Sequence, residues 1–180
     1  MKDKVFKNSF YKVSEIEPEM LRKFMLNEVG EKSKEKLYNY LRDLAESYPE
    51  FDKWFYEIVI PEVEKKDDKR EIIIVLSELS GENKVVLSGI AILKRTDSER
   101  KICTFRVHEE YRNLGIGTAL FEECFIFLNT RKPIITISSD RIEMFKKHIE
   151  NYGFVQKQVL TNYYKQGSDE YVYNGTLERA

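Results

Sequence analysis

The amino-acid sequence predicts an α/β domain with one mixed, largely antiparallel central sheet and helices on both faces. Two observations carry this prediction. Three strand-like segments follow one another at 71–79, 84–93 and 100–107, and the turn compositions between them favour antiparallel neighbours. A short, continuously apolar segment at 133–138 lies between two helical patterns, which is typical of a buried strand in an α/β sheet.

The length predicts a single domain that spans residues 1–180. Of these 180 residues 42% are apolar, and a chain of this size buries about 70% of its accessible surface on folding. Such a core needs neither metal nor disulfide staples. No repeat, low-complexity stretch or linker divides the chain, although residues 48–70 have the mixed composition of an insertion or elaboration.

The part of the chain before the three strands is expected to contain one strand and two helices. The strand covers 5–13, and the first helix covers 14–29. The second helix, at 33–48, has its apolar residues at helical spacing, and Pro49 stops it. That apolar face consists of Leu37, Tyr40, Leu41, Leu44 and Tyr48. For residues 48–70 we expect a short helix or loop that covers an apolar surface.

The second half of the chain is expected to alternate helix and strand. A mostly buried helix is predicted at 115–129, because apolar residues occupy more than half of its circumference. After the short apolar strand, another helix begins with Ser139 or Asp140 as its N-cap and ends at Gly153. A β-hairpin over 154–175, with KQGSD as its tip, closes the domain.

Charge and cysteine content exclude several classes of protein. Thirty Lys and Arg against 31 Asp and Glu give a net charge of -1, which argues against a protein that holds nucleic acid by its global field. Cys103 and Cys124 stand in apolar runs without metal-ligand or redox spacing, so we interpret them as reduced core thiols and expect no metal. No segment has the ~18 apolar residues of a membrane span. We therefore expect a cytoplasmic protein without nucleic-acid or membrane partners, and the sequence leaves its oligomeric state, a homodimer included, open.

The segment with the clearest chemistry joins the strand at 100–107 to the helix that follows it. There the chain reads Arg112-Asn113-Leu114-Gly115-Ile116-Gly117. Glycines at a strand-to-helix turn let the backbone approach a ligand, and the free N–H groups of a first helical turn form an anion site that suits a pyrophosphate. Leu120 stands where a dinucleotide fingerprint needs a third glycine, and no P-loop lysine is present. A tight turn that only packs against the sheet is the alternative.

Residues 107–117 resemble the acetyl-CoA-binding signature of the GNAT superfamily of N-acetyltransferases, Val-x-Pro-x-Tyr-Arg-x-x-Gly-x-Gly. They read Val107-His108-Glu109-Glu110-Tyr111-Arg112-Asn113-Leu114-Gly115-Ile116-Gly117. Glu109 replaces the usual proline. The predicted order of elements is also similar to that of the family, and Asn151-Tyr152-Gly153-Phe154 resembles its second signature, which ends in Gly-Phe.

The resemblance implies a sheet splayed open between the strands at 101–107 and 133–138, with acetyl-CoA in the gap. Backbone groups near Val107 would hold the pantetheine and polarise the thioester carbonyl, and the loop amides would hold the pyrophosphate. The implied residues for binding acetyl-CoA are Val107, Arg112, Asn113, Leu114, Gly115, Ile116, Gly117 and Thr118. The implied activity is acetyl transfer to a primary amine of a small molecule or peptide by direct attack. The alternative is a non-catalytic acyl-CoA-binding or regulatory module of the same fold.

The sequence departs from the family pattern where a proton donor and a base are expected. Family members often carry a tyrosine four residues before the Gly of Gly-Phe, where this chain has Ile149, and we expect the neighbouring His148 to lie on the surface. By strand alternation, the side chains that share the direction of Val107 are those of Lys101, Cys103 and Phe105. None of the three is a good base, and Cys103 is expected to pack in the core.

Tyr164 is our candidate for the acid that protonates the departing thiolate, with Tyr163 as the alternate. Both stand at the end of the strand that begins at Phe154. Adjacent strand residues point to opposite faces, so we expect only one of the pair to serve. Tyr171 and Tyr173 alternate and are expected to fill the strand.

Two further groups have structural interpretations. Arg106 has apolar neighbours, and we expect it to pair with a carboxylate rather than to bind the acceptor. The aromatic cluster of Trp54, Phe55 and Tyr56 either floors the acceptor pocket or covers the sheet, and we favour the second interpretation.

Overall fold

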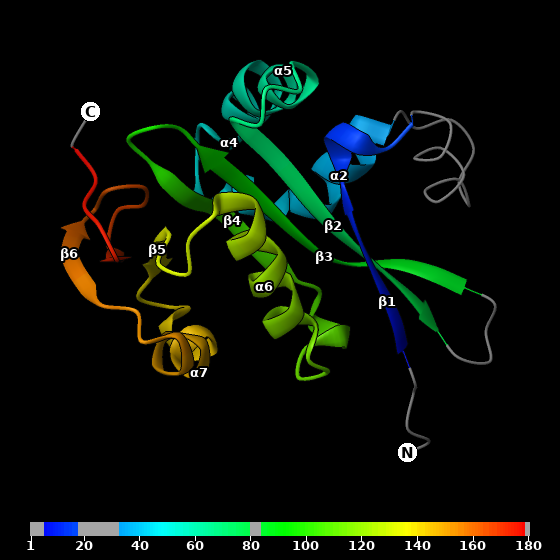
Figure 1. Ribbon diagram of the computed structural model, residues 1–180. Helices are drawn as coiled ribbons and strands as arrows, with labels where there is room; N and C mark the ends of the chain where they lie inside the picture. Colours follow the sequence, from blue (N-terminus) through cyan, green and yellow to red (C-terminus); the bar gives the residue numbers. More distant parts are fainter. Residues whose placement is uncertain (1–5, 18–32, 80–83, 179–180) are drawn as a thin grey trace.

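The computed structural model describes residues 6–17, 33–79 and 84–178, which contain one seven-stranded sheet (Figure 1). The strand order is β1-β2-β3-β4-β5-β7-β6. β4 and β5 are parallel, and the other neighbouring pairs in this sheet are antiparallel. The strands are β1 (Phe6–Lys12), β2 (Arg70–Leu79), β3 (Lys84–Arg95), β4 (Arg100–Val107), β5 (Ile134–Ser138), β6 (Gln156–Thr161) and β7 (Asp169–Tyr173).

Helices cover both faces of the sheet. α6 (Ile116–Leu128) and α7 (Ile142–Tyr152) lie on one face (Figure 1). The other face carries α2 (Ser33–Leu41), α3 (Asp43–Ser47), α4 (Phe51–Trp54), the π-helical turn η2 (Phe55–Val59) and α5 (Ile60–Glu64). Two 3-10 turns, η1 (Val13–Glu15) and η3 (Glu109–Tyr111), follow β1 and β4. The predicted mixed, largely antiparallel sheet with helices on both faces is confirmed.

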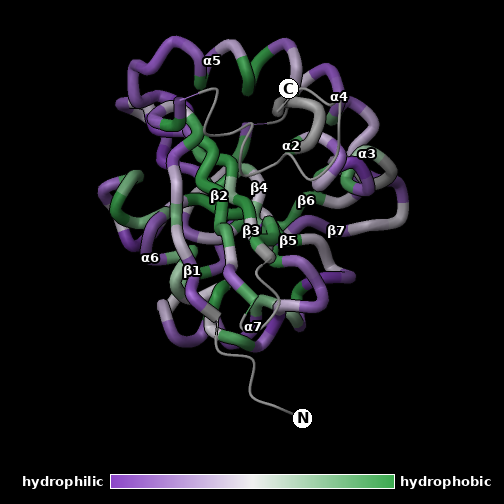
Figure 2. The backbone as a smooth tube through the Cα atoms, turned by 90° about the vertical axis from the view of Figure 1, so that its right-hand side faces the viewer, coloured by the Kyte–Doolittle hydropathy of each residue, from purple (hydrophilic) through white to green (hydrophobic). Residues whose placement is uncertain are grey.

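Each helical layer has its own apolar core, because side chains alternate between the two faces of the central strands. Ile73 and Val75 of β2 pack in the core under α6, whereas Ile72 and Ile74 pack under the α2–α5 layer. In Figure 2 hydrophobic strands run through the middle of the fold, and hydrophilic segments surround them. Within the described part of the chain, no helix is long and apolar enough to cross a bilayer.

The predicted helix at 33–48 is present but breaks at Arg42 into α2 and α3. Leu37, Leu41 and Leu44 are buried as expected. The predicted helix over 14–29 lies outside the described residues for most of its length, and the structure shows only η1 at its start.

Residues 51–64 form one helical run where we expected a short helix or loop. Its middle is a π turn, in which Ile60 N–H donates to the carbonyl of Phe55. Pro61 follows directly and has no N–H to donate, so a regular hydrogen-bond ladder cannot continue through this point. Phe55 and Val59 are fully buried against the sheet, which confirms that the segment covers an apolar surface.

The expected N-cap of α7 is wrong. The helix begins at Ile142, its N-cap position is Arg141, and no side chain caps it. Ser139 instead continues the strand pairing, because its N–H donates to the carbonyl of Asp169 at 2.9 Å. The predicted end of the helix at Gly153 is confirmed, with a left-handed φ of 59°.

β4 and β5 separate after a short paired stretch, as the resemblance implied. Only the pairs Lys101–Ile134 and Ile102–Ile135 form between these two strands, although both continue in the same direction beyond that point. β4 also has a bulge at Cys103, where its register with β3 shifts. A bulge bends its strand and increases the local twist, which helps β4 to diverge from β5.

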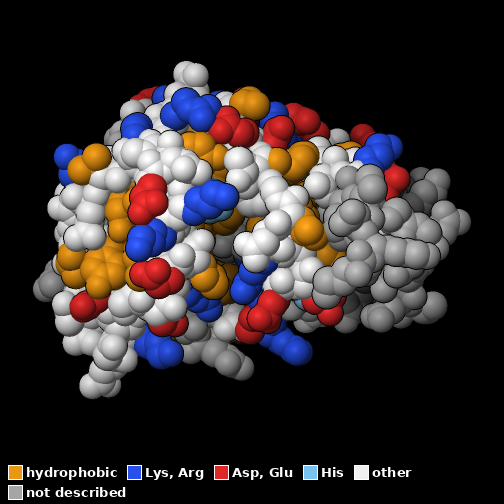
Figure 3. Space-filling view, turned by 90° about the horizontal axis from the view of Figure 1, so that it is seen from below, with side chains coloured by type: hydrophobic (Ala, Val, Ile, Leu, Met, Phe, Trp, Pro, Cys, Tyr) orange, Lys and Arg blue, Asp and Glu red, His pale blue; other side chains and the backbone are white. Residues whose placement is uncertain are grey.

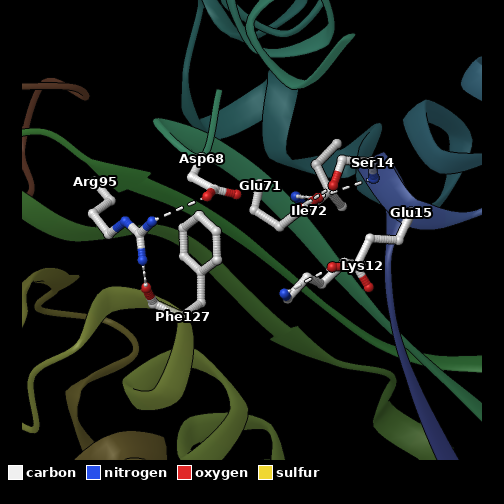
Figure 4. A network of polar contacts seen from close by, with 8 residues as sticks. All are labelled: Lys12, Ser14, Glu15, Asp68, Glu71, Ile72, Arg95 and Phe127. Carbon is white, nitrogen blue, oxygen red and sulfur yellow. Dashed lines mark hydrogen bonds and ion pairs between the residues drawn. The ribbon is translucent and has the colours of Figure 1, made fainter. Parts of the chain in front are cut away.

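Two arginines from the sheet fix the C-terminus of α6. Arg95 donates to the carbonyl of Phe127 at 2.7 Å, and Arg100 donates to that of Leu128 at 2.9 Å. Figure 4 shows the first contact, together with the ion pair between Arg95 and Asp68. Cations at this end of a helix satisfy free carbonyls and the negative end of its dipole. The other end of α6 follows β4, the strand that diverges from β5.

Candidate active site

The loop between β4 and α6 has a backbone that glycine and asparagine adopt more easily than other residues. Gly115 has a φ of 81° and Asn113 a φ of 62°. No atom lies within 4 Å of the position that a Cβ of Gly115 would take, so the surface beside the helix is open there. The N–H groups of Ile116, Gly117 and Thr118 belong to the first turn of α6 and have no acceptor inside the helix. Together with the helix dipole they can bind an anion.

Arg112 connects this loop to the end of β4. Its Nε donates to the carbonyl of Val107 at 3.2 Å, and its Nη1 lies 3.8 Å from the sulfur of Met144 on α7. Arg112 and Leu114 are exposed. A positive charge therefore lies beside the free N–H groups, which strengthens the anion site.

The expectation that His148 lies on the surface is wrong. The side chain is half-buried, its ring centroid lies 4.9 Å from that of Phe121 on α6, and burial lowers its pKa. α7 packs against α6 and turns this residue toward Gly117 in the first turn of α6. Ile149, where the family has its tyrosine, packs against the apolar core on the same side of the sheet.

A cavity of about 570 Å³ occupies the gap between β4 and β5. Residues 101–105 of β4 and 135–138 of β5 form its two long walls. The remaining walls include Tyr48, Phe51, Trp54, Phe145, Tyr163 and Tyr164. Side chains from both helical layers thus contact one space that passes through the sheet. Seen from below, the face that carries α7 and the start of α6 is hollowed near its middle, between hydrophobic and cationic side chains (Figure 3).

Cys103 lines this cavity and does not share the direction of Val107. The bulge inserts one residue, so Phe105 and Val107 pack on the α6 side while Cys103 packs on the α2–α5 side. Its sulfur accepts a hydrogen bond from Nη1 of Arg70 at 3.4 Å, and burial raises the pKa of its thiol. The alternation argument is therefore wrong for Cys103, whereas the expected core packing is confirmed in part, because the side chain packs against the α2–α5 core and also lines the cavity. Cys124 is fully buried, as expected.

Tyr163 and Tyr164 both line the cavity. β6 ends at Thr161, so the two tyrosines lie in the turn of the hairpin and strand alternation does not separate them. The hydroxyl of Tyr163 donates to the carbonyl of Glu178 at 3.4 Å. The ring of Tyr164 lies edge-on to that of Tyr48 at 5.1 Å, and burial raises the pKa of its hydroxyl. Tyr164 therefore keeps its proton at neutral pH.

The structural interpretation of Arg106 is confirmed. Its guanidinium donates to both carboxylate oxygens of Asp43, with 2.5 Å between Nη2 and Oδ2, and these hydrogen bonds lower the pKa of Asp43.

The three residues of the aromatic cluster at 54–56 lie in different environments. Phe55 covers the sheet, as favoured, whereas Trp54 lines the cavity and Tyr56 is exposed.

Sequence reasoning missed Glu170 on β7. Its side chain is 2% exposed, and it shares one face of the strand with fully buried Val172, two residues later. That alternation was the available signal, because an acidic residue on the buried face of a strand is unusual. Tyr173 is buried and Tyr171 is partly buried in the core under α6 and α7, so both fill the strand as expected.

The profile of the "Acetyltransferase (GNAT) family" matches residues 34–140. NAA60 of Arabidopsis thaliana, solved in complex with acetyl-CoA, has a TM-score of 0.62 and 18% identity over 93% of this chain and 97% of its own. A spermidine/spermine N-acetyltransferase of Vibrio cholerae has a TM-score of 0.55 and 16% identity over 92% of this chain and 91% of its own. The ribosomal-protein-S18-alanine N-acetyltransferase of Escherichia coli has a TM-score of 0.53 and 14% identity over 93% and 92%. No curated protein sequence matches the chain significantly.

Proposed function

The chain belongs to the GNAT family of acetyltransferases, and from this premise we propose that it moves the acetyl group of acetyl-CoA to a primary amine of a small molecule or peptide. Acetyl-CoA is the co-substrate of this acyltransferase family. One observation carries the proposal: the cavity of about 570 Å³ lies where β4 and β5 separate, and Phe145 of α7 and Phe51 of α4 line it from opposite faces of the sheet. The acetyl donor can reach the gap from the α6 side while an amine approaches from the other.

The residues at the start of α6 fit acetyl-CoA. Open space at Gly115, free N–H groups in the first helical turn and the charge of Arg112 suit a pyrophosphate. The backbone of Val107, at the end of β4, suits the pantetheine. When bound, acetyl-CoA supplies a thioester whose acetyl group is activated for transfer.

The chain's own residues would align the amine and manage protons. Overall, one N–H and one C–S bond are exchanged for an N–C and an S–H bond, so a proton must leave nitrogen and a proton must reach sulfur. Tyr164 is proposed as the donor to sulfur, because this residue lines the cavity and its hydroxyl stays protonated. Tyr163 remains the alternate, although its hydroxyl is held by the Glu178 carbonyl.

The proposal of an amine acceptor is supported by proteins of the same fold. They include a spermidine/spermine N-acetyltransferase and a ribosomal-protein-S18-alanine N-acetyltransferase. The cavity wall carries both charges, with Glu50 and Glu99 beside Arg70, Lys94, Lys101 and Arg141, so its charge does not select the acceptor. The two free cysteines support a reducing compartment, and we propose the cytoplasm.

The test is release of free CoA from acetyl-CoA, followed with a thiol reagent, in the presence of amines of different classes. Polyamines, aminoglycosides, peptides with free N-termini and lysine peptides form the panel. The proposal predicts release with at least one class, together with acetylated product by mass spectrometry. Tight acetyl-CoA binding with no release for any amine would instead favour a non-catalytic acyl-CoA-binding module, a reading that Ile149 in place of the family's tyrosine supports.

A further inference from the structure

Glu170 is a buried carboxylate that lies one strand away from the cavity between β4 and β5. Its Oε2 atom is buried and has no hydrogen-bond partner among the described residues. The residue pairs across the strands with Ser138, which lines the large cavity, and cross-strand partners point to the same face. Burying a carboxylate oxygen without a partner costs free energy, so this arrangement lowers the stability of the folded state.

Glu170 lines a second, smaller cavity that shares part of its wall with the first. It measures about 10 Å³, which is roughly the space that one water molecule needs. Glu170 lines it together with Tyr48, Ser138 and Arg141, and these three residues also line the large cavity. Glu170 itself does not line the large cavity, so a proton from a molecule there would reach it through a water in the smaller one.

The carboxylates in the wall of the large cavity, Glu50 and Glu99, lack this combination of burial and an unpartnered oxygen. Glu99 forms an ion pair with Lys94 at 2.6 Å, and Glu50 is exposed to solvent. Among the described residues that line the two cavities, Glu170 is the carboxylate that combines burial with an unpartnered oxygen.

The groups around Glu170 come from three segments. They are Asp140 and Arg141 from the β5–α7 turn, Tyr48 from the segment before α4, and Tyr164 and Lys165 from the hairpin turn. Burial and, to a smaller extent, the negative charge of Asp140 raise the pKa of Glu170 to about 7, with Arg141 opposing both. A group that exchanges its proton near neutral pH is suited to act as a base there.

We propose that Glu170 is the general base, whose carboxylate takes a proton from the ammonium group of the acceptor amine. The proposal rests on the proposed function. In this step the ammonium and the Glu170 carboxylate become a neutral amine and a carboxylic acid. The N–H bond breaks, an O–H bond forms at Glu170, and the nitrogen lone pair becomes free to attack. The carboxylic acid returns the proton to solvent before the next cycle.

The experiment compares wild type, Glu170→Gln and Asp140→Asn. Asp140 is exposed, so its substitution should leave the fold intact while lowering the pKa of Glu170. The first readout needs no ligand: a carbon-13 NMR titration of the glutamate carboxyl groups. We expect a midpoint near pH 7 in wild type, its loss in Glu170→Gln, and a lower midpoint in Asp140→Asn.

The second readout is kcat/KM as a function of pH, with spermidine and an alanine-initiated peptide as probes. We expect the wild-type value to rise through the pH of the carboxyl midpoint. Glu170→Gln should lose this rise and at least 100-fold in kcat/KM at pH 8 with unchanged acetyl-CoA affinity, and Asp140→Asn should shift the rise to lower pH. Glu150→Gln, an exposed glutamate on α7, is the matched control and should behave as wild type.

Two results would overturn the assignment while leaving the proposed function intact. One is a Glu170→Gln protein that has the turnover and the pH profile of wild type. The other is an Asp140→Asn protein in which the titration midpoint of Glu170 moves while the inflection of kcat/KM with pH stays where it is in wild type. This second result can be obtained even if Glu170→Gln does not fold. Absence of CoA release with every amine, in wild type as well, would overturn the proposed function and the base assignment together.

Discussion

Gly117 and His148 face each other where the first turn of α6 packs against α7. A Cβ on Gly117 would lie 3.3 Å from Nε2 of the imidazole and 3.8 Å from a methyl group of Val107. The first of these distances is shorter than an ordinary van der Waals contact, so a larger residue would displace either the imidazole or the helix turn. The geometry of the free N–H groups at this turn is thus coupled to the position of α7.

This relationship predicts a coupling between the two residues. Gly117→Val should weaken CoA binding more than tenfold with little loss of fold, because the added methyl groups push the turn out of place. Gly117→Ala should weaken binding less, and the double variant Gly117→Ala with His148→Ala should recover part of the loss. Titration calorimetry with CoA on wild type, Gly117→Ala, His148→Ala and the double variant measures the coupling. Unchanged affinity in folded Gly117→Val would contradict the assignment of the loop.

Gly115 offers a prediction with a matched control elsewhere in the chain. Gly115 and Gly167 have φ values of 81° and 80°, and neither has an atom within 4 Å of its Cβ position. A side chain at either site therefore carries a similar backbone cost, roughly 1 kcal/mol. Gly115→Val should weaken CoA binding more than tenfold, whereas Gly167→Val should leave it unchanged. Equal CoA dissociation constants in the two variants, with equal melting temperatures, would mean that the loop does not bind the pyrophosphate.

The tyrosines of the hairpin turn should differ in their contribution to turnover. Tyr164→Phe keeps the ring contact with Tyr48 and removes only the hydroxyl, so we expect turnover to fall about tenfold or more with unchanged acetyl-CoA affinity. Tyr163→Phe should stay near wild type, because its hydroxyl is engaged by a backbone carbonyl. Steady-state CoA release provides the measurement. If both variants keep full turnover, the thiolate leaves unaided or through water.

The buried carboxyl of Glu170 should make folding stability fall as pH rises. Its pKa is raised from 4.5 to about 7, so between these values the native state binds more protons than the unfolded state. The contribution of Glu170 to the free energy of unfolding is complete below about pH 4.5 and is lost as the pH rises through about 7. The loss is at most about 3 kcal/mol.

Glu170→Gln removes this titration and should flatten the stability profile. Urea unfolding of both proteins at pH 5 and pH 8 measures the difference. The variant should gain stability relative to wild type between these two pH values, with Glu150→Gln as the control. A parallel pH dependence in wild type and Glu170→Gln would show that the carboxyl is solvated in the native state.

The order of the elements and the loop at the start of α6 followed from the sequence because their signals are local. Strand alternation, turn residues and helix ends depend on neighbours within a few positions. The residues from Val107 to Thr118 are likewise consecutive, so a strand, two glycines and a helix start could be recognised together and their geometry expected in advance.

Tertiary structure alone decided which distant residues meet at the cavity. The bulge at Cys103 reverses the faces of the β4 residues that precede Thr104, and strand alternation cannot reveal an insertion that depends on pairing with β3. Packing of α7 on α6 turns His148 toward Gly117. Glu170 is brought beside Ser138 only because β7 inserts between β5 and β6. These long-range contacts bury the carboxyl of Glu170, and burial raises its pKa. The sequence by itself determines only that a glutamate stands at this position.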